Sequence, residues 1–187
     1  MSQRLHDAGY DVCACDLFHE NFTPPDAIRF CPADLNADFS TKLDGPWDVI
    51  VALELIEHLE NPRNFVRECK RLLAPGGLVV MSTPNLGNPV SHALFLRKGD
   101  FQWFSEMDYR EHGHISPLAP SAARRCFSEQ GFVQRFEGSV SNPYRKMRSL
   151  RKLGSRIAAH VLTLFLATPK SLRGEVYMGI WQKDATT

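Results

Sequence analysis

Residues 47–53 read WDVIVAL and residues 78–83 read LVVMST. Both are short, nearly uninterrupted apolar runs, a pattern typical of strands covered on both faces. Between them, Asn61 and Pro62 are the residue types of a helix N-cap and first turn, and apolar residues recur at helical spacing over 65–73. A strand, a helix and a second strand in this order predict a parallel pair joined by a crossover helix.

The rest of the chain continues the same alternation. Its apolar periodicity and its glycine and proline breaks predict helices over 2–8 and 120–130 and strands over 10–15, 27–31, 132–136 and 175–182. With 187 residues, the chain has the size of one domain. We therefore expect one domain with a Rossmann-like, doubly wound, mostly parallel α/β sheet.

Composition excludes several classes of protein. The hydrophobic content of 43% is too high for a disordered tail, and the net charge of +1 argues against a nucleic-acid-binding surface. No apolar run reaches the roughly 18 residues of a membrane-spanning helix. Five cysteines without a C-x-x-C pair, and no secretory signal at the start, favour reduced thiols in a cytoplasmic protein.

Acidic and polar residues follow the predicted strands directly. Asp16, Asp34, Glu54 and Asn85 all lie at or just after a strand end. Ligands of such sheets bind outside the carboxyl ends of the strands, and a carboxylate there can accept both hydroxyls of a ribose. Each Asp could equally be a turn or cap residue.

The combination of these segments resembles a known family. Asp16, then Asp34-Leu35, then WDVIVALELIEHLENP (47–62), then RLLAPGGLVVMSTPN (71–85) are similar to class I S-adenosylmethionine-dependent methyltransferases. The resemblance is strongest to the branch of the ubiquinone-biosynthesis O-methyltransferases, and it covers about residues 4–136. It implies S-adenosylmethionine as cofactor.

The resemblance also implies roles for single residues. Asp16 would bind the cofactor ribose, and Asp34 would accept from the adenine amino group. Leu35 would offer a nearby backbone donor and an adenine wall, and Leu53 would line the methionine side. In a plainer interpretation, Asp34 caps a turn and Leu53 belongs to the core.

One element of the family pattern is missing from this sequence. The family begins with a strand that ends in a G-x-G-x-G loop, whereas the twelve glycines here include no such run. We therefore expect an N-terminally truncated domain without its first central strand. Between the neighbours of that strand a slot of about 9.6 Å, two ladder spacings, would remain, and the chain would bind cofactor poorly.

The candidate bases for removing a proton from a methyl acceptor are His58, His112 and His114. Imidazole titrates near neutral pH, which suits a phenol or a similar hydroxyl. His114 is the first choice, because residues 99–116 lie where family members build a lid over the acceptor. The loop aromatics, among them Trp103, could wall an apolar substrate. Alternatively, His114 only fixes the loop by bonding its backbone. We expect His58 to order the loop after 47–53 and to border the cofactor.

The run Glu54-Leu55-Ile56-Glu57-His58 has the pattern E-x-x-E-H, which could hold a divalent cation. Spacing alone supports this weakly, since Glu57 and His58 are adjacent and cannot share a helix face. We expect a structural role and no metal site.

Charge is distributed unevenly along the chain. Residues 1–137 hold 13 Lys and Arg against 19 Asp and Glu, whereas residues 138–187 hold 9 against 2. The basic stretch leads into apolar residues at helical spacing, which predicts a basic amphipathic helical insertion over about 144–168. Such a helix could rest on an anionic membrane, at the inner membrane surface, or cover a lipophilic substrate. It could also dock on its own domain or form a dimer contact.

Three functions remain open from the sequence. The favoured one is methyl transfer to a small-molecule acceptor. A hydroxyl acceptor is favoured by resemblance and by the lack of an Asn/Asp-Pro-Pro-Tyr motif after residues 47–53. A non-catalytic, methyltransferase-like binding or assembly module is the alternative. A nicotinamide dehydrogenase fits less well, because the EHL and APGG segments have no purpose there.

Overall fold

A computed structural model describes residues 1–22, 27–143, 153–165 and 169–185. The main elements are α1 (Ser2–Asp7), β1 (Cys13–Asp16), β2 (Arg29–Pro32), β3 (Trp47–Leu53), α2 (Pro62–Leu72), β4 (Leu73–Pro84), α3 (Pro89–Lys98), α4 (Glu106–His112), α5 (Pro120–Glu129), β5 (Phe132–Val140), α6 (Leu153–Phe165) and β6 (Val176–Lys183). A short 3-10 helix, η3 (Ile56–His58), follows β3. The predicted alternation of strands and helices is confirmed, with several strand ends shifted by one to five residues.

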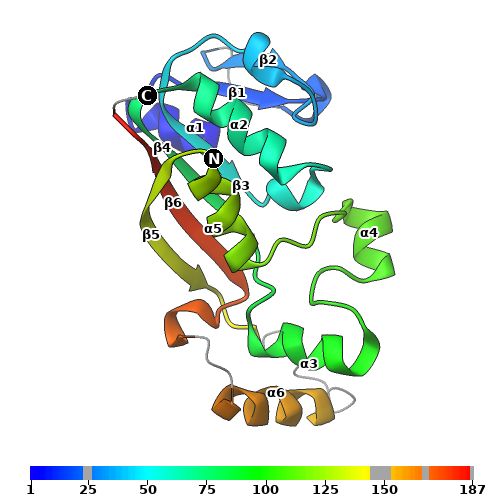
Figure 1. Ribbon diagram of the computed structural model, residues 1–187. Coiled ribbons are helices and arrows are strands. Elements are labelled where there is room, and N and C mark those ends of the chain that lie inside the picture. The colour runs from blue at the N-terminus through cyan, green and yellow to red at the C-terminus, as the bar shows by residue number, and fades with distance from the viewer. Residues whose placement is uncertain (23–26, 144–152, 166–168, 186–187) are drawn as a thin grey trace.

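The strands form two separate sheets (Figure 1). One has the order β3-β4-β6-β5, with β3 and β4 parallel and β6 antiparallel to both of its neighbours. The other contains only the parallel pair β1 and β2. This break is the arrangement expected of a Rossmann-like fold that lacks a central strand.

Strand β4 begins earlier than predicted. Trp47 pairs with Leu73 and Val49 pairs with Leu78, so the register jumps between these two pairs. The intervening residues contain the expected turn, with Gly76 at a φ of 78°. That left-handed conformation favours glycine, because a Cβ would be strained there.

One face of the four-stranded sheet carries the core. Val79, Met81, Tyr177 and Trp181 lie on it and are buried, and α2 and α5 lie over it (Figure 1). The Trp181 indole stacks on Phe127 of α5, with ring centroids 4.7 Å apart. The helix α2 begins as predicted, since the Asn61 side chain accepts a hydrogen bond from the helix backbone.

The opposite face of this sheet is apolar and exposed. Val49 and Val51 of β3 are 45% and 38% exposed, and Val133, Phe136 and Val140 of β5 are 48–49% exposed. The prediction that both faces of β3 are covered is therefore wrong for the described chain. The second face would need a covering layer that the described residues do not provide, since large exposed apolar patches are rare on monomers.

Replacing Val49 and Val51 together by Thr should reduce self-association at high protein concentration, as measured by light scattering. Thr keeps the β-branched shape, so the melting temperature should change little. The matched control is Val79→Thr, which buries a hydroxyl on the core face and should destabilise the fold by about 1–3 kcal/mol. If the light scattering of the double variant were unchanged, the exposed apolar face would not be the cause of self-association.

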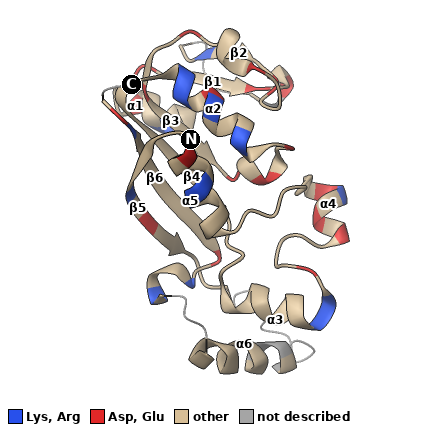
Figure 2. Ribbon diagram, viewed as in Figure 1, with Lys and Arg blue, Asp and Glu red and all other residues tan. Residues whose placement is uncertain are grey.

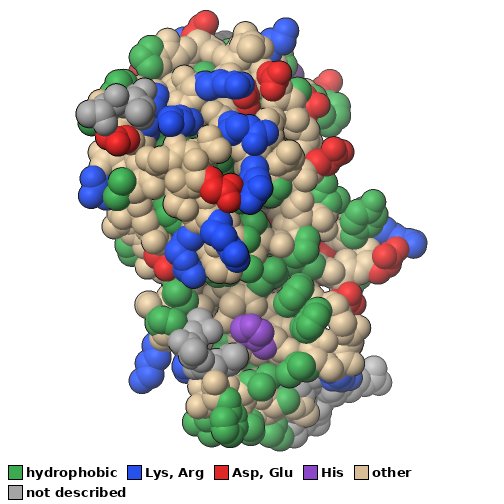
Figure 3. Space-filling model, in the orientation of Figure 1, with side chains coloured by type: hydrophobic (Ala, Val, Ile, Leu, Met, Phe, Trp, Pro, Cys, Tyr) green, Lys and Arg blue, Asp and Glu red, His purple; other side chains and the backbone are tan. Residues whose placement is uncertain are grey.

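The helices α3 and α6 pack against each other at one end of the molecule (Figure 1). Ala159 of α6 is buried against Val90 and Ala93 of α3. The larger apolar residues of α6 point elsewhere, with Leu164 and Phe165 each 80% exposed. Figure 3 shows hydrophobic side chains gathered over α6 at this end of the molecule.

A helix is present over 153–165, within the predicted insertion, while 144–152 and 166–168 lie outside the described residues, so the basic insertion as a whole stays a prediction. The helix packs on α3 through Ala159 and the partly buried Leu162, whereas Leu164 and Phe165 remain exposed. Within the described chain, none of the helices has the length and apolarity needed to span a membrane.

Candidate functional site

The residues predicted to bind the cofactor lie at or just after the carboxyl ends of β1, β2 and β3. Asp16 and Asp34 are exposed, and each accepts a hydrogen bond from the backbone N–H two residues later, at 3.2 Å and 2.9 Å. Leu35 and Leu53 are half-buried, and Leu35 packs against the core. Asp34 therefore does shape a turn, and its binding role stays a prediction.

The chain leaves β3 through a strained residue. Glu54 has a φ of 50°, in the left-handed region that non-glycine residues rarely adopt. Its N–H donates to the backbone oxygen of Ser82, and the Ser82 hydroxyl donates to Glu54 Oε1 at 2.7 Å. These bonds hold the bend that turns the chain into η3 and sends the next carboxylate, Glu57, inward.

Glu57 is a fully buried carboxylate. Thr83 Oγ1 donates to its Oε2 at 2.9 Å, while no described residue bonds the buried Oε1. Burial raises the pKa of Glu57 to about 7, and the nearby Glu54 adds to the rise. The Thr83 hydroxyl opposes it. A carboxyl group that titrates near neutral pH can exchange a proton with a neighbouring base.

This pKa predicts how stability depends on pH. Because the ordinary value is 4.5, folded Glu57 keeps a proton that the unfolded chain loses between about pH 4.5 and 7. The free energy of unfolding should therefore fall by up to about 3 kcal/mol as pH rises through this window. The side chain of Glu57→Gln cannot ionise. The melting temperature of this variant should therefore rise relative to that of the native protein between about pH 5 and about pH 8. If the melting temperatures of the two proteins changed with pH in the same way, the raised pKa of Glu57 would be contradicted.

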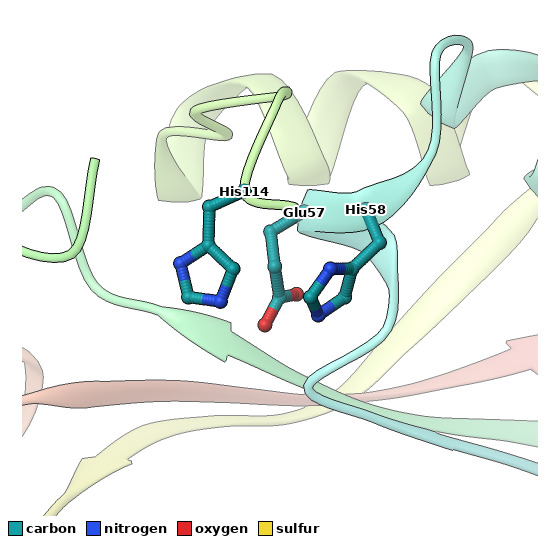
Figure 4. A group of neighbouring side chains, drawn as sticks. All are labelled: Glu57, His58 and His114. Atoms are coloured by element: carbon teal, nitrogen blue, oxygen red, sulfur yellow. The ribbon is translucent and has the colours of Figure 1, made fainter. Parts of the chain in front are cut away.

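Two imidazoles flank Glu57 (Figure 4). His58 Nδ1 lies 3.2 Å from the backbone oxygen of Gly113, and His114 Nδ1 lies 2.7 Å from that of Trp103. A carbonyl oxygen only accepts, so Nδ1 carries the proton in both rings and Nε2 is the basic atom of the neutral forms. The ring centroids are 4.9 Å apart, and one potential ligand atom from each of the three side chains lies within 4.8 Å of the others.

The loop that carries His114 is fastened to η3. The backbone oxygen of Glu57 accepts from Ile115 N at 3.0 Å and from Ser116 N at 2.9 Å, and Ser116 Oγ donates to the oxygen of Leu59. The preceding helix α4 ends at Gly113, whose φ of 70° suits glycine. The predicted pair of His58 and His114 is therefore brought together from two distant segments.

Sequence reasoning did not single out Glu57 as part of the proton-handling group. The sequence signal was present in E-x-x-E-H, but Glu54 bonds Ser82 instead of joining the cluster. Two imidazole nitrogens and one carboxylate can exchange protons or hold a borderline divalent cation. His112 is exposed on α4, with its ring centroid 5.9 Å from that of His114.

Comparison with known proteins shows the family to which this chain belongs. A family model described as "Methyltransferase domain" matches residues 1–134. The chain belongs to the class I S-adenosylmethionine-dependent methyltransferases. It is 30% identical over 157 residues to a ubiquinone biosynthesis O-methyltransferase of Psychrobacter arcticus, covering 78% of this chain and 60% of that protein. The methyltransferase thus spans less than two thirds of the length of this relative.

Solved structures support the fold of this methyltransferase. A SAM-dependent methyltransferase from Archaeoglobus fulgidus superimposes with a TM-score of 0.64 at 14% identity, over 96% of this chain and 79% of that one. A chain in a complex of the Haloferax volcanii Trm112 methyltransferase activator with a methyltransferase superimposes with a TM-score of 0.63 at 12% identity. The match covers 97% of this chain and 75% of that one. At such identities the likeness concerns the fold alone.

The family implies S-adenosylmethionine as cofactor, and the described residues fit part of it. The exposed carboxylates of Asp16 and Asp34 lie at the ends of two paired strands, where an adenosine with its ribose hydroxyls and amino group can be bound. The glycine-rich backbone that would approach the rest of the cofactor is not among the 187 residues. The described residues therefore offer acceptors for the adenosine side only, and the binding role of Asp16 and Asp34 stays a prediction.

Proposed function

We propose that this protein transfers a methyl group from S-adenosylmethionine to a hydroxyl group of a small, lipophilic molecule. The observation that carries the proposal is the group of Glu57, His58 and His114 beside the carboxyl ends of β3 and β4. Curated relatives are named ubiquinone biosynthesis O-methyltransferases, which favours an oxygen acceptor.

In this proposal, the cofactor supplies an activated methyl group, and the chain manages the acceptor proton. His114 Nε2 accepts the proton of the acceptor hydroxyl, since its Nδ1 is held by the Trp103 carbonyl. The neighbouring Glu57 carboxylate stabilises the imidazolium that results. His58 fixes residues 99–116, here called the lid loop, through Gly113 and offers a second basic nitrogen at the same site.

The loop over this group has an apolar wall. Phe104 lies 5.6 Å from the His114 ring, and Phe101 stacks on Phe95 of α3 at 4.6 Å, both measured between ring centroids. Aromatic walls exclude water from the reacting hydroxyl and suit an aromatic acceptor.

Transfer of a radiolabelled methyl group to catechols with and without an alkyl chain tests the proposal. The cofactor should be present at millimolar concentration, because we propose that the chain as given binds it weakly. Labelled product from the alkylated catechol supports the function. A chain that binds S-adenosylhomocysteine but labels no hydroxyl compound would instead favour the binding or assembly module.

We also propose that the α3–α6 end of the molecule contacts the inner, cytoplasmic surface of a membrane. The exposed side chains of Leu164 and Phe165 support this, as do Arg97 and Lys98 at the end of α3. In Figure 2, the ribbon positions of Lys and Arg on α2 and α5 lie on another part of the molecule, away from α3 and α6.

Replacing Leu164 and Phe165 together by Asp should abolish sedimentation with anionic vesicles, because two charges would enter the headgroup region. A matched control is the pair Met107→Asp and Tyr109→Asp, which changes exposed apolar residues on α4. Equal sedimentation of the native protein with anionic and neutral vesicles would remove the membrane proposal.

A further inference from the structure

A buried carboxylate next to the last strand is connected to the proposed base through Trp103. Glu175 immediately precedes β6 and is 8% exposed. Its main chain is held on two sides, because its N–H donates to the oxygen of Ser141 at 3.2 Å and its oxygen accepts from Asn85 N at 2.9 Å. The Glu175 main chain is therefore held between the residues that follow β4 and β5.

The Glu175 carboxylate holds the first part of the lid loop. One oxygen, Oε1, accepts from Trp103 Nε1 and from Gln102 Nε2, both at 3.2 Å. The backbone N–H of Gln102 donates to Ser91 Oγ of α3, also at 3.2 Å. Two neighbouring loop residues are thus anchored to β6 and α3.

Trp103 has an unfavourable backbone conformation in this position. Its φ is 71°, in the left-handed region, which costs a bulky residue roughly 1–3 kcal/mol and persists only when the surroundings hold it. The same residue presents the carbonyl that accepts from His114 Nδ1 at 2.7 Å. The indole contact with Glu175 therefore stabilises the backbone conformation that orients His114.

We propose that Glu175 is a positioning residue for His114. It acts through Trp103, by fixing the carbonyl that selects the Nδ1–H form of the imidazole and leaves Nε2 as the basic atom. The importance of this orientation for methyl transfer rests on the function proposed above. The orientation itself does not depend on that function.

The tautomer of His114 can be read directly from its ring nitrogen shifts in the ¹⁵N-labelled full chain at a pH where the ring is neutral. The native protein should show the Nδ1–H form. Glu175→Leu removes the shared acceptor, so this form should be lost in favour of a mixture. Glu175→Gln should restore it, because the amide oxygen can replace Oε1 as acceptor for both donors.

Two further variants separate positioning from general damage. Trp103→Phe removes the indole donor but keeps the carbonyl, and it should shift the tautomer in the same direction as Glu175→Leu. Glu137→Leu is the control, because Glu137 is a carboxylate of β5 that accepts from Tyr177 at 2.8 Å. It should leave His114 unchanged even if it lowers the melting temperature.

The outcomes are distinct. If folded Glu175→Leu and folded Trp103→Phe both keep the Nδ1–H form, the proposal is overturned. If the tautomer shifts and kcat falls about 10- to 100-fold with KM little changed, both proposals hold. If the tautomer shifts but kcat does not change, Glu175 still positions His114, and the catalytic role of His114 fails.

Discussion

His114→Gln is expected to lower kcat for methyl transfer by about 100- to 10,000-fold, the usual contribution of a positioned general base. Gln can still donate to the Trp103 carbonyl, so the loop should keep its place. It cannot accept a proton at neutral pH. Steady-state kinetics with a hydroxyl acceptor, at cofactor concentrations far above those needed for half-saturation, would measure the loss.

The matched control for this variant is His112→Gln. His112 is the other histidine of the same segment, yet it is exposed at the end of α4. Its replacement should change kcat less than twofold or so, as for a surface substitution away from the site. If both variants were equally active, the base would have to be another group, and His58→Gln would be the next variant to measure.

Cofactor affinity is expected to rise by about 10- to 1,000-fold when a strand, a G-x-G-x-G loop and a helical turn are fused ahead of Ser2. Two or three new backbone hydrogen bonds at roughly 0.5–1.5 kcal/mol each account for that range. Isothermal titration with S-adenosylhomocysteine would measure the change relative to the unfused chain.

The control for the fusion is the same segment with its three glycines changed to Val. The strand could still pair with β3, but Cβ atoms would keep the loop from approaching the cofactor. The control should therefore complete the sheet without the gain in affinity. Micromolar affinity of the unfused chain would show that residues 1–187 already suffice and that the adenosine-side residues carry the binding.

The strong apolar runs made most of the fold predictable. Residues 47–53 form β3 as expected, and the cap at Asn61 starts α2. Exposure of Val49 and Val51 was not predictable, because an apolar run is the same whether or not a layer covers it. The apolar periodicity of α6 likewise predicted an apolar face without showing that Ala159 and Leu162 would contact α3.

The candidate site was predictable only in part. The histidines were found because their side chains have few uses besides binding and proton transfer. The role of Glu57 depends on the bend at Glu54, which rests on hydrogen bonds to Ser82, a residue of another strand. The anchor at Glu175 depends on contacts with Trp103 across the fold. Contacts between segments so far apart leave no periodicity in the sequence.

The separation of β1 and β2 from the larger sheet affects more than cofactor geometry. These two strands contain no fully buried residue, and the neighbouring Ala33 and Phe39 join the main core instead. Amide hydrogens of this pair should therefore exchange with solvent faster than those of β4 and β6, through local opening. A ligand bound at Asp16 and Asp34 would have to meet the entropic cost of closing this pair, so its binding should slow that exchange.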